Sequence, residues 1–516
     1  MKIAITGVSG SMGREALKQT MELDEVRSIR VLVTPKKKHN KYCHKLKKTY
    51  GDRIEILRGS ISDDVLCEKL VEGCDMVINM AAVIPPHSDK DPDASYQCNQ
   101  LGAMRLTDAI SKMKNQAKFI HISTVALYGN RTLEHPWGRE GDPLLPSAFD
   151  PYAMHKLIGE RYVLESNIKY KTVLRQTAML YPEIIFANIS DGLLYHTVLN
   201  GPLEWVTAKD SGTLIKNIVK AEIEGINDVF WNNIYDVSGG ECNRRTGYDT
   251  FADGFKIMGG SPKAYVCPRE IATRNFHGLW YADGAELEKS YHYRSESVDG
   301  FWMAIGKKYR VFKVAKFLPA GLIRLFIFKR LLRDKNAPTC WIKDGDEAKV
   351  YAYMGGMQKA KSAPKKWDGV IVADRKQYGS EEISPEIIYK DKLLNHGYDE
   401  NKPVTEWDLE DMQGAAKYRG GKCLSSYMVK GAIHDKLLWQ CSEGHTFHMT
   451  PFTVLKGGHW CPMCQPQPWS YDKLAKKSPF YAQVWYDSHD KDEDVCYWFD
   501  ENWAAHMRQL TGDERL

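Results

Sequence analysis

The sequence predicts an α/β fold in which a doubly wound parallel sheet is followed by smaller carboxyl-terminal parts. Three observations support it. The apolar segment KIAITG (2–7) runs into the glycine-rich GVSGSMG and then into a helical pattern. Two more apolar segments, SIRVLV (28–33) and CDMVINMAAV (74–83), follow and are separated by helix-like stretches. Strands that alternate with helices form parallel sheets, because each helix returns the chain to the same edge.

The turn after the first expected strand has the glycine spacing of a dinucleotide site. Gly7, Gly10 and Gly13 are three apart. The first permits a tight bend, the second lets the backbone approach a phosphate, and the third allows close packing of helix on strand. The N–H groups of the helix that follows, including those of Ser11 and Met12, then face the pyrophosphate. The pattern predicts a Rossmann-type fold.

The end of the second expected strand indicates which dinucleotide is bound. An acidic residue there holds the ribose 2′-hydroxyl of NAD, whereas cations favour the 2′-phosphate of NADP. The sequence continues VLVTPKKKHNKYCHKLKK, with no acid and seven lysines between Lys36 and Lys48. We therefore expect NADP, with NAD as the alternative, and we expect Lys36 and Lys37 to contact it. The other interpretation of these lysines is a solvated helix face.

Length and composition bound the rest of the molecule. A chain of 516 residues is longer than one hydrophobic core usually organises, which suggests about three domains. The net charge of +5 does not by itself imply nucleic acid or membrane. Twelve cysteines without a signal-peptide pattern indicate a reducing compartment. No apolar run is long enough to cross a bilayer. We expect a multidomain cytoplasmic protein.

Five further segments follow the glycine turn, in this order: NMAA (79–82), CNQLGAMRL (98–106), HISTVALYG (121–129), DPYAMHK (150–156) and VLRQTAMLYP (173–182). Together with the turn they resemble the extended short-chain dehydrogenase/reductase family. That family includes NAD-dependent epimerases and dehydratases as well as carbonyl reductases. The resemblance covers residues 1–310. It implies a Rossmann-type domain with a small substrate lobe, mainly within residues 180–300.

The segment DPYAMHK carries an acid–base pair. Tyr152 and Lys156 are four apart, so on a helix they share one face. A tyrosine with a pKa of about 10 exchanges protons poorly at neutral pH. A neighbouring lysine favours the phenolate and lowers that pKa. The resemblance implies that Tyr152 exchanges the proton with the substrate oxygen, and that Lys156 also holds the nicotinamide ribose.

The same resemblance assigns the other expected site residues. Thr124 takes the position of the hydroxyl that hydrogen-bonds the substrate oxygen, and Asn99 matches the asparagine that orders the active site. The remaining expected cofactor contacts are Ser60, Ile61, Ala81, Ala82 and Ser123. Ser60 replaces the aspartate that the family directs at adenine, so this contact stays open.

Departures from the family pattern narrow the range of reactions that we expect. Val125 and Ala126 stand where sugar dehydratases carry an acidic pair, so we do not expect dehydration. We expect an oxidoreductase that interconverts a carbonyl and an alcohol on an unidentified small molecule. One alternative is a nucleotide-sugar epimerase with tightly bound NAD. Another is a regulatory or nucleic-acid-binding protein that senses a dinucleotide and acts through its carboxyl-terminal part.

Residues 311–420 read as a helical and linker region. The stretch 307–332 alternates cationic and apolar residues, and Pro319 and Gly321 interrupt it. It has two interpretations: a helix that lies on a membrane surface, or a helix that packs on the first domain.

The segment LWQCSEGHTFHMTPFTVLKGGHWCPMCQ (438–465) has the spacing of a metal site. Two ligand pairs, Cys441 with His445 and Cys461 with Cys464, are separated by about fifteen residues, which is typical of tetrahedral zinc. Four sulfur and nitrogen ligands favour a closed, structural zinc. Residues 421–470 resemble a zinc ribbon, with His448 and His459 as rival ligands, and 471–516 are expected to be helical.

The expected partner is a small carbonyl or alcohol. Few basic residues occur in 437–470, so binding of nucleic acid is not expected. The sequence leaves a homodimer open.

Overall fold

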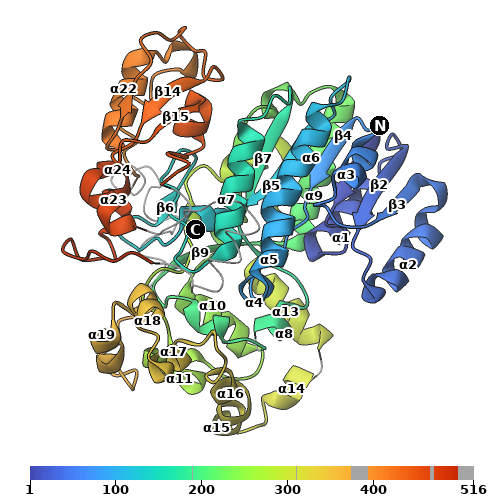
Figure 1. Cartoon of the computed structure of the whole chain (residues 1–516). Helices are drawn as coiled ribbons and strands as arrows, with labels where there is room; N and C mark the ends of the chain where they lie inside the picture. Colours follow the sequence, from blue (N-terminus) through green and yellow to red (C-terminus); the bar gives the residue numbers. More distant parts are fainter. Residues whose placement is uncertain (189, 310, 374–392, 465–469, 498–516) are drawn as a thin grey trace.

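The computed structural model describes residues 1–188, 190–309, 311–373, 393–464 and 470–497 (Figure 1). A seven-stranded parallel sheet forms the centre, in the order β10-β7-β5-β4-β1-β2-β3. Its strands are β1 (Lys2–Thr6), β2 (Ser28–Val33), β3 (Ile54–Arg58), β4 (Met76–Asn79), β5 (Lys118–Thr124), β7 (Lys171–Gln176) and β10 (Ile234–Val237). The predicted doubly wound sheet is confirmed.

Helices cover both faces of this sheet. On one face α1 (Ser11–Thr20) packs against α9 (Ala208–Glu224), and α2 (Asn40–Tyr50) joins their apolar cluster. The other face carries α3 (Asp64–Val71), α6 (Gly102–Ser111) and α7 (Pro151–Leu164). The strand order reverses between β1 and β4, so the crevice for a ligand lies at the carboxyl ends of these strands.

A smaller lobe follows the fifth strand of the sheet. Its three-stranded sheet has the order β11-β9-β8, and a short pair joins β6 to β12. The strands are β6 (Trp137–Gly138), β8 (Ala178–Leu180), β9 (Pro202–Thr207), β11 (Arg244–Thr246) and β12 (Trp280–Tyr281). The helices are α8 (Ile184–Asn188), α10 (Gly247–Lys256), α11 (Pro262–Tyr265) and α13 (Val298–Lys308), whereas α12 (Ala285–Tyr291) returns to pack on α9 and β10 of the central sheet.

The segment after α13 is a series of short helices. These are α14 (Val311–Ala315), α15 (Ala320–Ile323), a π-helical turn (Arg324–Phe328), α16 (Lys329–Leu331), α17 (Pro338–Asp344), α18 (Glu347–Met354) and α19 (Met357–Ser362). Pro319 immediately precedes α15, in agreement with the predicted break. None of the helices in the described ranges has the length and apolar character needed to cross a bilayer.

The carboxyl-terminal part contains α22 (Leu409–Tyr418), a sheet β13-β14-β15 and two further helices. The strands are β13 (Lys422–Cys423), β14 (Leu437–Gln440) and β15 (Thr446–Met449), and the helices are α23 (Tyr471–Lys477) and α24 (Pro479–Trp485). Their apolar core includes Leu145, Ala148 and Met154 of the first domain. The first 310 residues therefore share a core with the end of the chain. The expected helical segment 471–516 is described only to residue 497.

Candidate active site

The glycine turn has the geometry that a dinucleotide needs. Gly7 has φ +72°, and a Cβ placed there would lie 2.3 Å from the Met80 carbonyl oxygen. A Cβ at Gly13 would lie 2.3 Å from the Gly7 oxygen. Gly10 precedes α1 without a side-chain cap, so the first N–H groups of that helix, at Ser11 and Met12, are open to an anion. The residues present fit a pyrophosphate.

The predicted NADP contacts lie at the carboxyl end of β2. Lys36 and Lys37 are exposed and stand where the chain turns into α2. A third cation, which the sequence analysis did not single out, borders the glycine turn: Arg14 donates from Nε to the Ser9 carbonyl at 3.0 Å. Its guanidinium lies 4.9 Å from the centre of the Tyr42 ring. Its place directly after Gly13 was the signal that could have identified it.

The other expected cofactor contacts follow the ends of β3 and β4. Ser60 is exposed and bonds the Ser62 hydroxyl at 2.8 Å, whereas Ile61 is buried beneath it. Ala81 is fixed by its N–H, which donates to the Thr6 hydroxyl at 3.1 Å, and Ala82 is exposed. All four lie at the sheet edge that carries the glycine turn.

Thr124 and Tyr152 meet at the wall of one cavity. Thr124 ends β5, and Tyr152 stands in the first turn of α7. Asp150 caps α7 by accepting from the Ala153 N–H at 3.0 Å, and Pro151 occupies the first helical position. Burial raises the pKa of Tyr152 to about 12, although a hydrogen bond with Thr124 lowers it. The predicted pair of hydroxyl groups is brought together.

Lys156 lies one turn further along α7 and is buried. Its Nζ donates to the Ile122 carbonyl oxygen of β5 at 2.5 Å. Burial lowers its pKa to about 8. Burial of the phenol outweighs the Thr124 hydrogen bond, and the lowering of the Tyr152 pKa by Lys156 stays a prediction.

Asn99 acts through the backbone and does not bond Tyr152 or Lys156. Its side-chain oxygen accepts from the Val83 N–H at 2.9 Å, and its amide donates to the Val83 carbonyl at 2.8 Å. The same amide donates to Ser95 at 2.9 Å. Asn99 therefore fixes the loop that follows β4. Its neighbour Cys98, which the sequence analysis did not consider, lies near Lys156, which lowers the Cys98 pKa, whereas burial raises it to about 11.

Ser123 faces away from the cavity. It is 1% exposed, and its hydroxyl donates to Glu160, a carboxylate on the same face of α7 as Tyr152 and Lys156. Arg175 also binds this carboxylate, with Nη2 2.6 Å from Oε1. Sequence reasoning missed Glu160, although continuing the four-residue spacing of Tyr152 and Lys156 would have found it. The expected cofactor contact of Ser123 stays a prediction.

The cavity beside Thr124 and Tyr152 measures about 670 Å³. Its walls are mostly apolar and include Met179, Tyr181 and Trp205 from the smaller lobe. Trp341, Lys349 and Tyr353 from α17 and α18 also line it. Residues within 311–420, which the sequence assigns to a helical and linker region, thus form part of the cavity wall. No local motif marks them, because only the fold brings them to this site.

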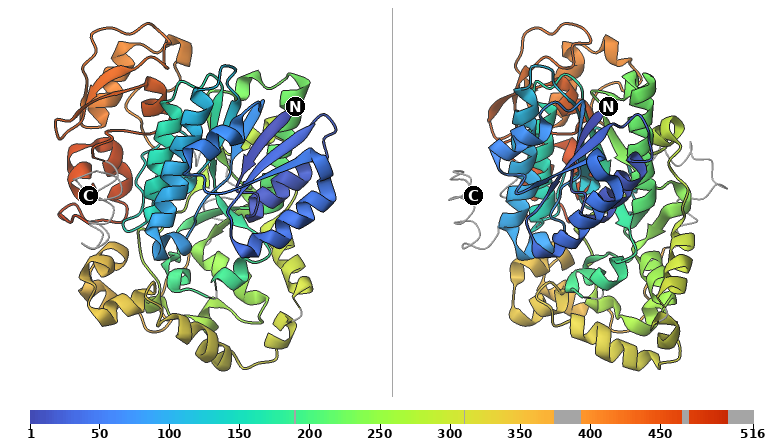
Figure 2. Two further views of the ribbon diagram at one scale, coloured as in Figure 1. Left: turned by 45° about the vertical axis from the view of Figure 1, so that its right-hand side comes forward. Right: turned by 90° about the vertical axis from the view of Figure 1, so that its right-hand side faces the viewer.

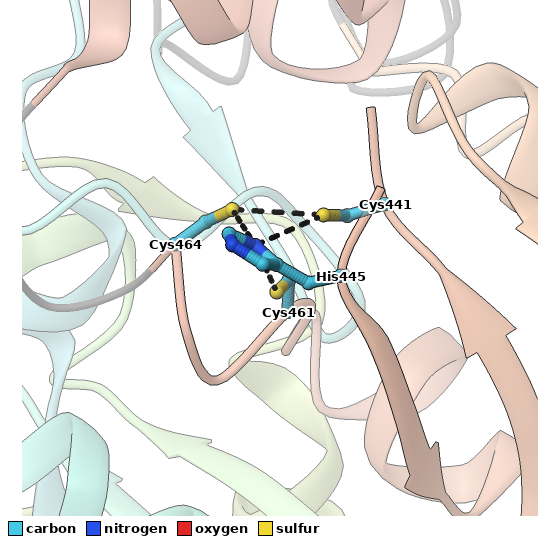
Figure 3. A group of neighbouring side chains, drawn as sticks. All are labelled: Cys441, His445, Cys461 and Cys464. Atoms are coloured by element: carbon cyan, nitrogen blue, oxygen red, sulfur yellow. Dashed lines mark hydrogen bonds between the residues drawn. The ribbon is translucent and has the colours of Figure 1, made fainter. Parts of the chain in front are cut away.

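Cys441, His445, Cys461 and Cys464 point at one another (Figure 3). The Sγ atoms of Cys441 and Cys464 are 3.7 Å apart, and the His445 Nδ1 lies 3.5 Å from Cys441, 3.7 Å from Cys461 and 3.4 Å from Cys464. A tetrahedral zinc with sulfur ligands at about 2.3 Å spaces its ligands by about 3.8 Å. The four side chains fit such an ion.

The two rival histidine ligands lie elsewhere. His448 is exposed on β15. His459 is fully buried, and its Nε2 bonds the Glu160 Oε1 at 3.0 Å. The neighbouring Gly457 carbonyl accepts from Arg175 at 2.6 Å. The segment between the two ligand pairs thus contacts the helix that carries Tyr152.

Comparison with known proteins gives one family match. Residues 3–183 match the model of the NAD dependent epimerase/dehydratase family. The chain is 23% identical over 141 residues to the D-erythronate dehydrogenase of Haemophilus influenzae, covering 26% of this chain and 41% of that protein. It is 27% identical over 167 residues to the dTDP-glucose 4,6-dehydratase of Mycolicibacterium smegmatis, covering 32% and 48%. The chain thus spans less than half the length of these curated relatives.

Two solved structures also align with part of this chain. The dTDP-glucose 4,6-dehydratase of Bacillus anthracis in complex with NAD aligns with a TM-score of 0.47 and 18% identity, covering 61% of this chain and 98% of that one. The UDP-glucuronic acid 4-epimerase of Bacillus cereus aligns with a TM-score of 0.45 and 21% identity, covering 60% and 100%. The family match is confined to residues 3–183, and this stretch contains the glycine turn, Thr124, Tyr152 and Lys156.

Proposed function

We propose that this protein is an NAD(P)-dependent oxidoreductase that interconverts a carbonyl and an alcohol on a small molecule. One observation carries the proposal: the Thr124 and Tyr152 side chains lie together at the wall of a cavity of about 670 Å³. A ketone oxygen placed between them meets two hydroxyl groups. The glycine turn that fits a dinucleotide lies at the same edge of the sheet.

The proposed reaction divides the work between the dinucleotide and the protein. The bound dinucleotide supplies or accepts the hydride. In the direction of reduction, Tyr152 gives its phenolic proton to the substrate oxygen, and Thr124 donates a hydrogen bond that orients that oxygen. Lys156 lies one helical turn from Tyr152 on the same face of α7. Once its Nζ leaves the Ile122 carbonyl, its charge can stabilise the phenolate that remains.

The cations beside the dinucleotide site favour NADP over NAD. Lys36 and Lys37 are exposed at the end of β2, where an acidic residue would bind the ribose 2′-hydroxyl of NAD. Two lysines there can form charge-assisted hydrogen bonds with a 2′-phosphate. The description of the matching family names NAD, so both dinucleotides belong in the first assay.

The charge of the cavity favours an apolar substrate over a nucleotide sugar. A diphosphate is bound by arginine or lysine. Among the described residues that line the cavity, Lys349 is the only one of these two types. Six carboxylates also line it: Asp89, Asp150, Asp191, Glu204, Asp253 and Asp346. Three of these six pair with cations outside the wall, Asp191 with Lys90, Glu204 with Arg244 and Asp253 with Arg245. The wall therefore offers a diphosphate little cationic charge and suits an apolar carbonyl or alcohol.

We further propose that the Cys441 cluster binds one structural zinc. Its four ligands leave no position open for substrate or water, as in closed zinc sites. The contacts of His459 and Gly457 with Glu160 and Arg175 give the metal module a role that does not require a nucleic acid. It holds α7 against β5 and β7.

The proposed function is tested by following nicotinamide absorbance with NADPH and NADH over a panel of ketones and aldehydes. The panel should include bulky apolar compounds, short polar compounds and nucleotide sugars. We expect reduction of bulky apolar members and none of the nucleotide sugars. Turnover of a UDP-sugar without net change in nicotinamide absorbance would instead support the epimerase alternative.

A further inference from the structure

One end of the molecule exposes apolar side chains beside cations. Residues 300–333 contain nine lysines and arginines and no acidic residue. The exposed apolar side chains of this stretch are Met303, Val311, Val314, Phe317, Leu318, Leu322, Leu325 and Phe326. Phe317 is 88% exposed and Phe326 is 70% exposed. Clustered apolar exposure of this kind marks a surface that contacts another body. We refer to residues 311–333 as the basic apolar face.

The exposed side chains are not needed for the core of their own helices. Phe312, Ile323, Phe328 and Leu331 already provide the buried side of this segment. Arg324, in the middle of the apolar run, turns inward and its Nη2 pairs with Glu270 at 2.7 Å. The inward side is therefore complete, and within the described residues the outward side stays apolar and exposed.

Cations border this apolar surface. Lys307, Lys308, Lys316, Lys329, Arg330 and Arg333 are exposed. The ion pairs of the described residues engage none of these six side chains. The charges are therefore free to meet an anionic surface. A second copy of this chain would present the same cations across a two-fold axis and would be repelled.

The basic apolar face lies at one end of the molecule. In Figure 1, α14, α15 and α16 lie at the lower end and β14 and β15 at the upper end, and both views in Figure 2 keep them apart. The substrate cavity is close to this lower end. Ile184 and Ile185 of α8 line the cavity, whereas the next residue, Phe186, is 40% exposed. The Phe186 ring lies 5.0 Å from that of Tyr309 and 6.0 Å from that of Phe312.

We propose that the basic apolar face docks on an anionic membrane surface. Interfacial helices place apolar side chains at the headgroup boundary and lysines and arginines against lipid phosphates. Phe317, Leu322 and Phe326 are the apolar side chains that enter, and Lys329 and Arg330 are cations that meet the headgroups. The helices of the basic apolar face are too short to span the bilayer, so this face contacts the membrane surface.

The proposal is tested by sedimentation of the full chain with vesicles of phosphatidylcholine, with and without phosphatidylglycerol. The wild type should bind the anionic vesicles, and binding should weaken as salt is raised. Lys329→Gln with Arg330→Gln should weaken it roughly fivefold for each cation removed. Phe317→Ser with Phe326→Ser should weaken it at least as much. Ile226→Ser with Val229→Ser, at residues 70% and 79% exposed on the loop after α9, is the matched control and should bind like the wild type.

Two results would overturn the proposal: no binding of the wild type to anionic vesicles at low salt, or unchanged binding by both folded variants. A lipid-free dimer that the phenylalanine variant dissociates would assign the face to a second copy instead. Thermal unfolding of each variant shows whether it is folded. The assay contains neither dinucleotide nor substrate, so its outcome is independent of the proposed oxidoreductase activity.

Discussion

His459 and Glu160 are 299 residues apart, fully buried, and joined by a hydrogen bond of 3.0 Å between Nε2 and Oε1. Glu160 lies two turns beyond Tyr152 on α7, and His459 lies two residues before Cys461. Burial raises the pKa of Glu160, but Arg175 and His459 outweigh it and hold that pKa below its usual range. The segment that carries the Cys441 cluster and the helix that carries Tyr152 are therefore one packed unit.

Removing this contact should destabilise the whole protein. His459→Ala removes one of the hydrogen bonds to the buried Glu160 carboxylate, which keeps Arg175 and Ser123, so we expect a loss of about 1–3 kcal/mol in the free energy of unfolding. His448→Ala, in the same module but exposed, is the matched control. Urea denaturation measures the free energy of unfolding of both variants. Equal stabilities for the two variants would show that the contact contributes nothing.

The Cys441 cluster should hold about one zinc per chain. Cys461→Ser should lower the zinc content and the melting temperature together, because the binding energy of structural zinc contributes to folding. Turnover should fall with them, since α7 loses its support. Cys242→Ser, at an exposed cysteine, is the control. Elemental analysis and thermal unfolding give the result. A metal-free wild type with an intact fold would rule the zinc out.

Tyr152→Phe should reduce turnover by about 10²–10⁴-fold, because the ring still packs and only the transferable proton is lost. The affinity for dinucleotide should be nearly unchanged. Tyr181→Phe removes a hydroxyl from the same cavity wall and should keep most of the activity. Steady-state kinetics and dinucleotide titration separate the two effects. Near-native turnover of Tyr152→Phe would remove this residue from the proton transfer.

Lys156→Met should abolish turnover yet stabilise the protein at neutral pH. Burial lowers the pKa of Lys156 from 10.5 to about 8. Below pH 8 the folded protein bears the full cost of a buried charge, about 3 kcal/mol. Between pH 8 and 10.5 the unfolded chain binds more protons, so this cost is relieved as pH rises. Losing the bond to the Ile122 carbonyl offsets part of the gain.

The measurement for Lys156 is the free energy of unfolding at pH 7 and pH 10. The variant should exceed the wild type by about 1–2 kcal/mol at pH 7, and the difference should shrink at pH 10. Lys361→Met, at an exposed lysine, is the control for the loss of one lysine. A difference that does not change with pH would contradict a buried, titrating Lys156.

Lys36→Ala combined with Lys37→Ala should weaken NADPH far more than NADH. A 2′-phosphate loses charge-assisted partners, while a 2′-hydroxyl never had them. Lys45→Ala with Lys48→Ala removes the same charge from exposed positions on α2 and is the matched control. Fluorescence titration with each dinucleotide gives the ratio of the dissociation constants for NADPH and NADH. Equal weakening by both double variants would assign Lys36 and Lys37 to the solvated surface.

The sequence by itself determined the parts of this protein that depend on local spacing. The strand, glycine turn and helix around Gly7, Gly10 and Gly13 follow from apolar runs and turn chemistry, and the structure forms them there. A separation of four residues puts Tyr152 and Lys156 on one helix face. The spacing of Cys441, His445, Cys461 and Cys464 let two short turns meet around one point. Each pattern needs only neighbours in the chain.

The tertiary structure decided what distant segments do to one another. Trp341, Lys349 and Tyr353 line the cavity beside Tyr152, and His459 bonds Glu160 and lies outside the Cys441 cluster. The same packing left Phe317 and Phe326 on the outside. These outcomes depend on contacts between residues more than a hundred positions apart. Burial and charge pairing between distant segments of the folded chain determine these contacts. Local spacing and periodicity in the sequence therefore do not predict them.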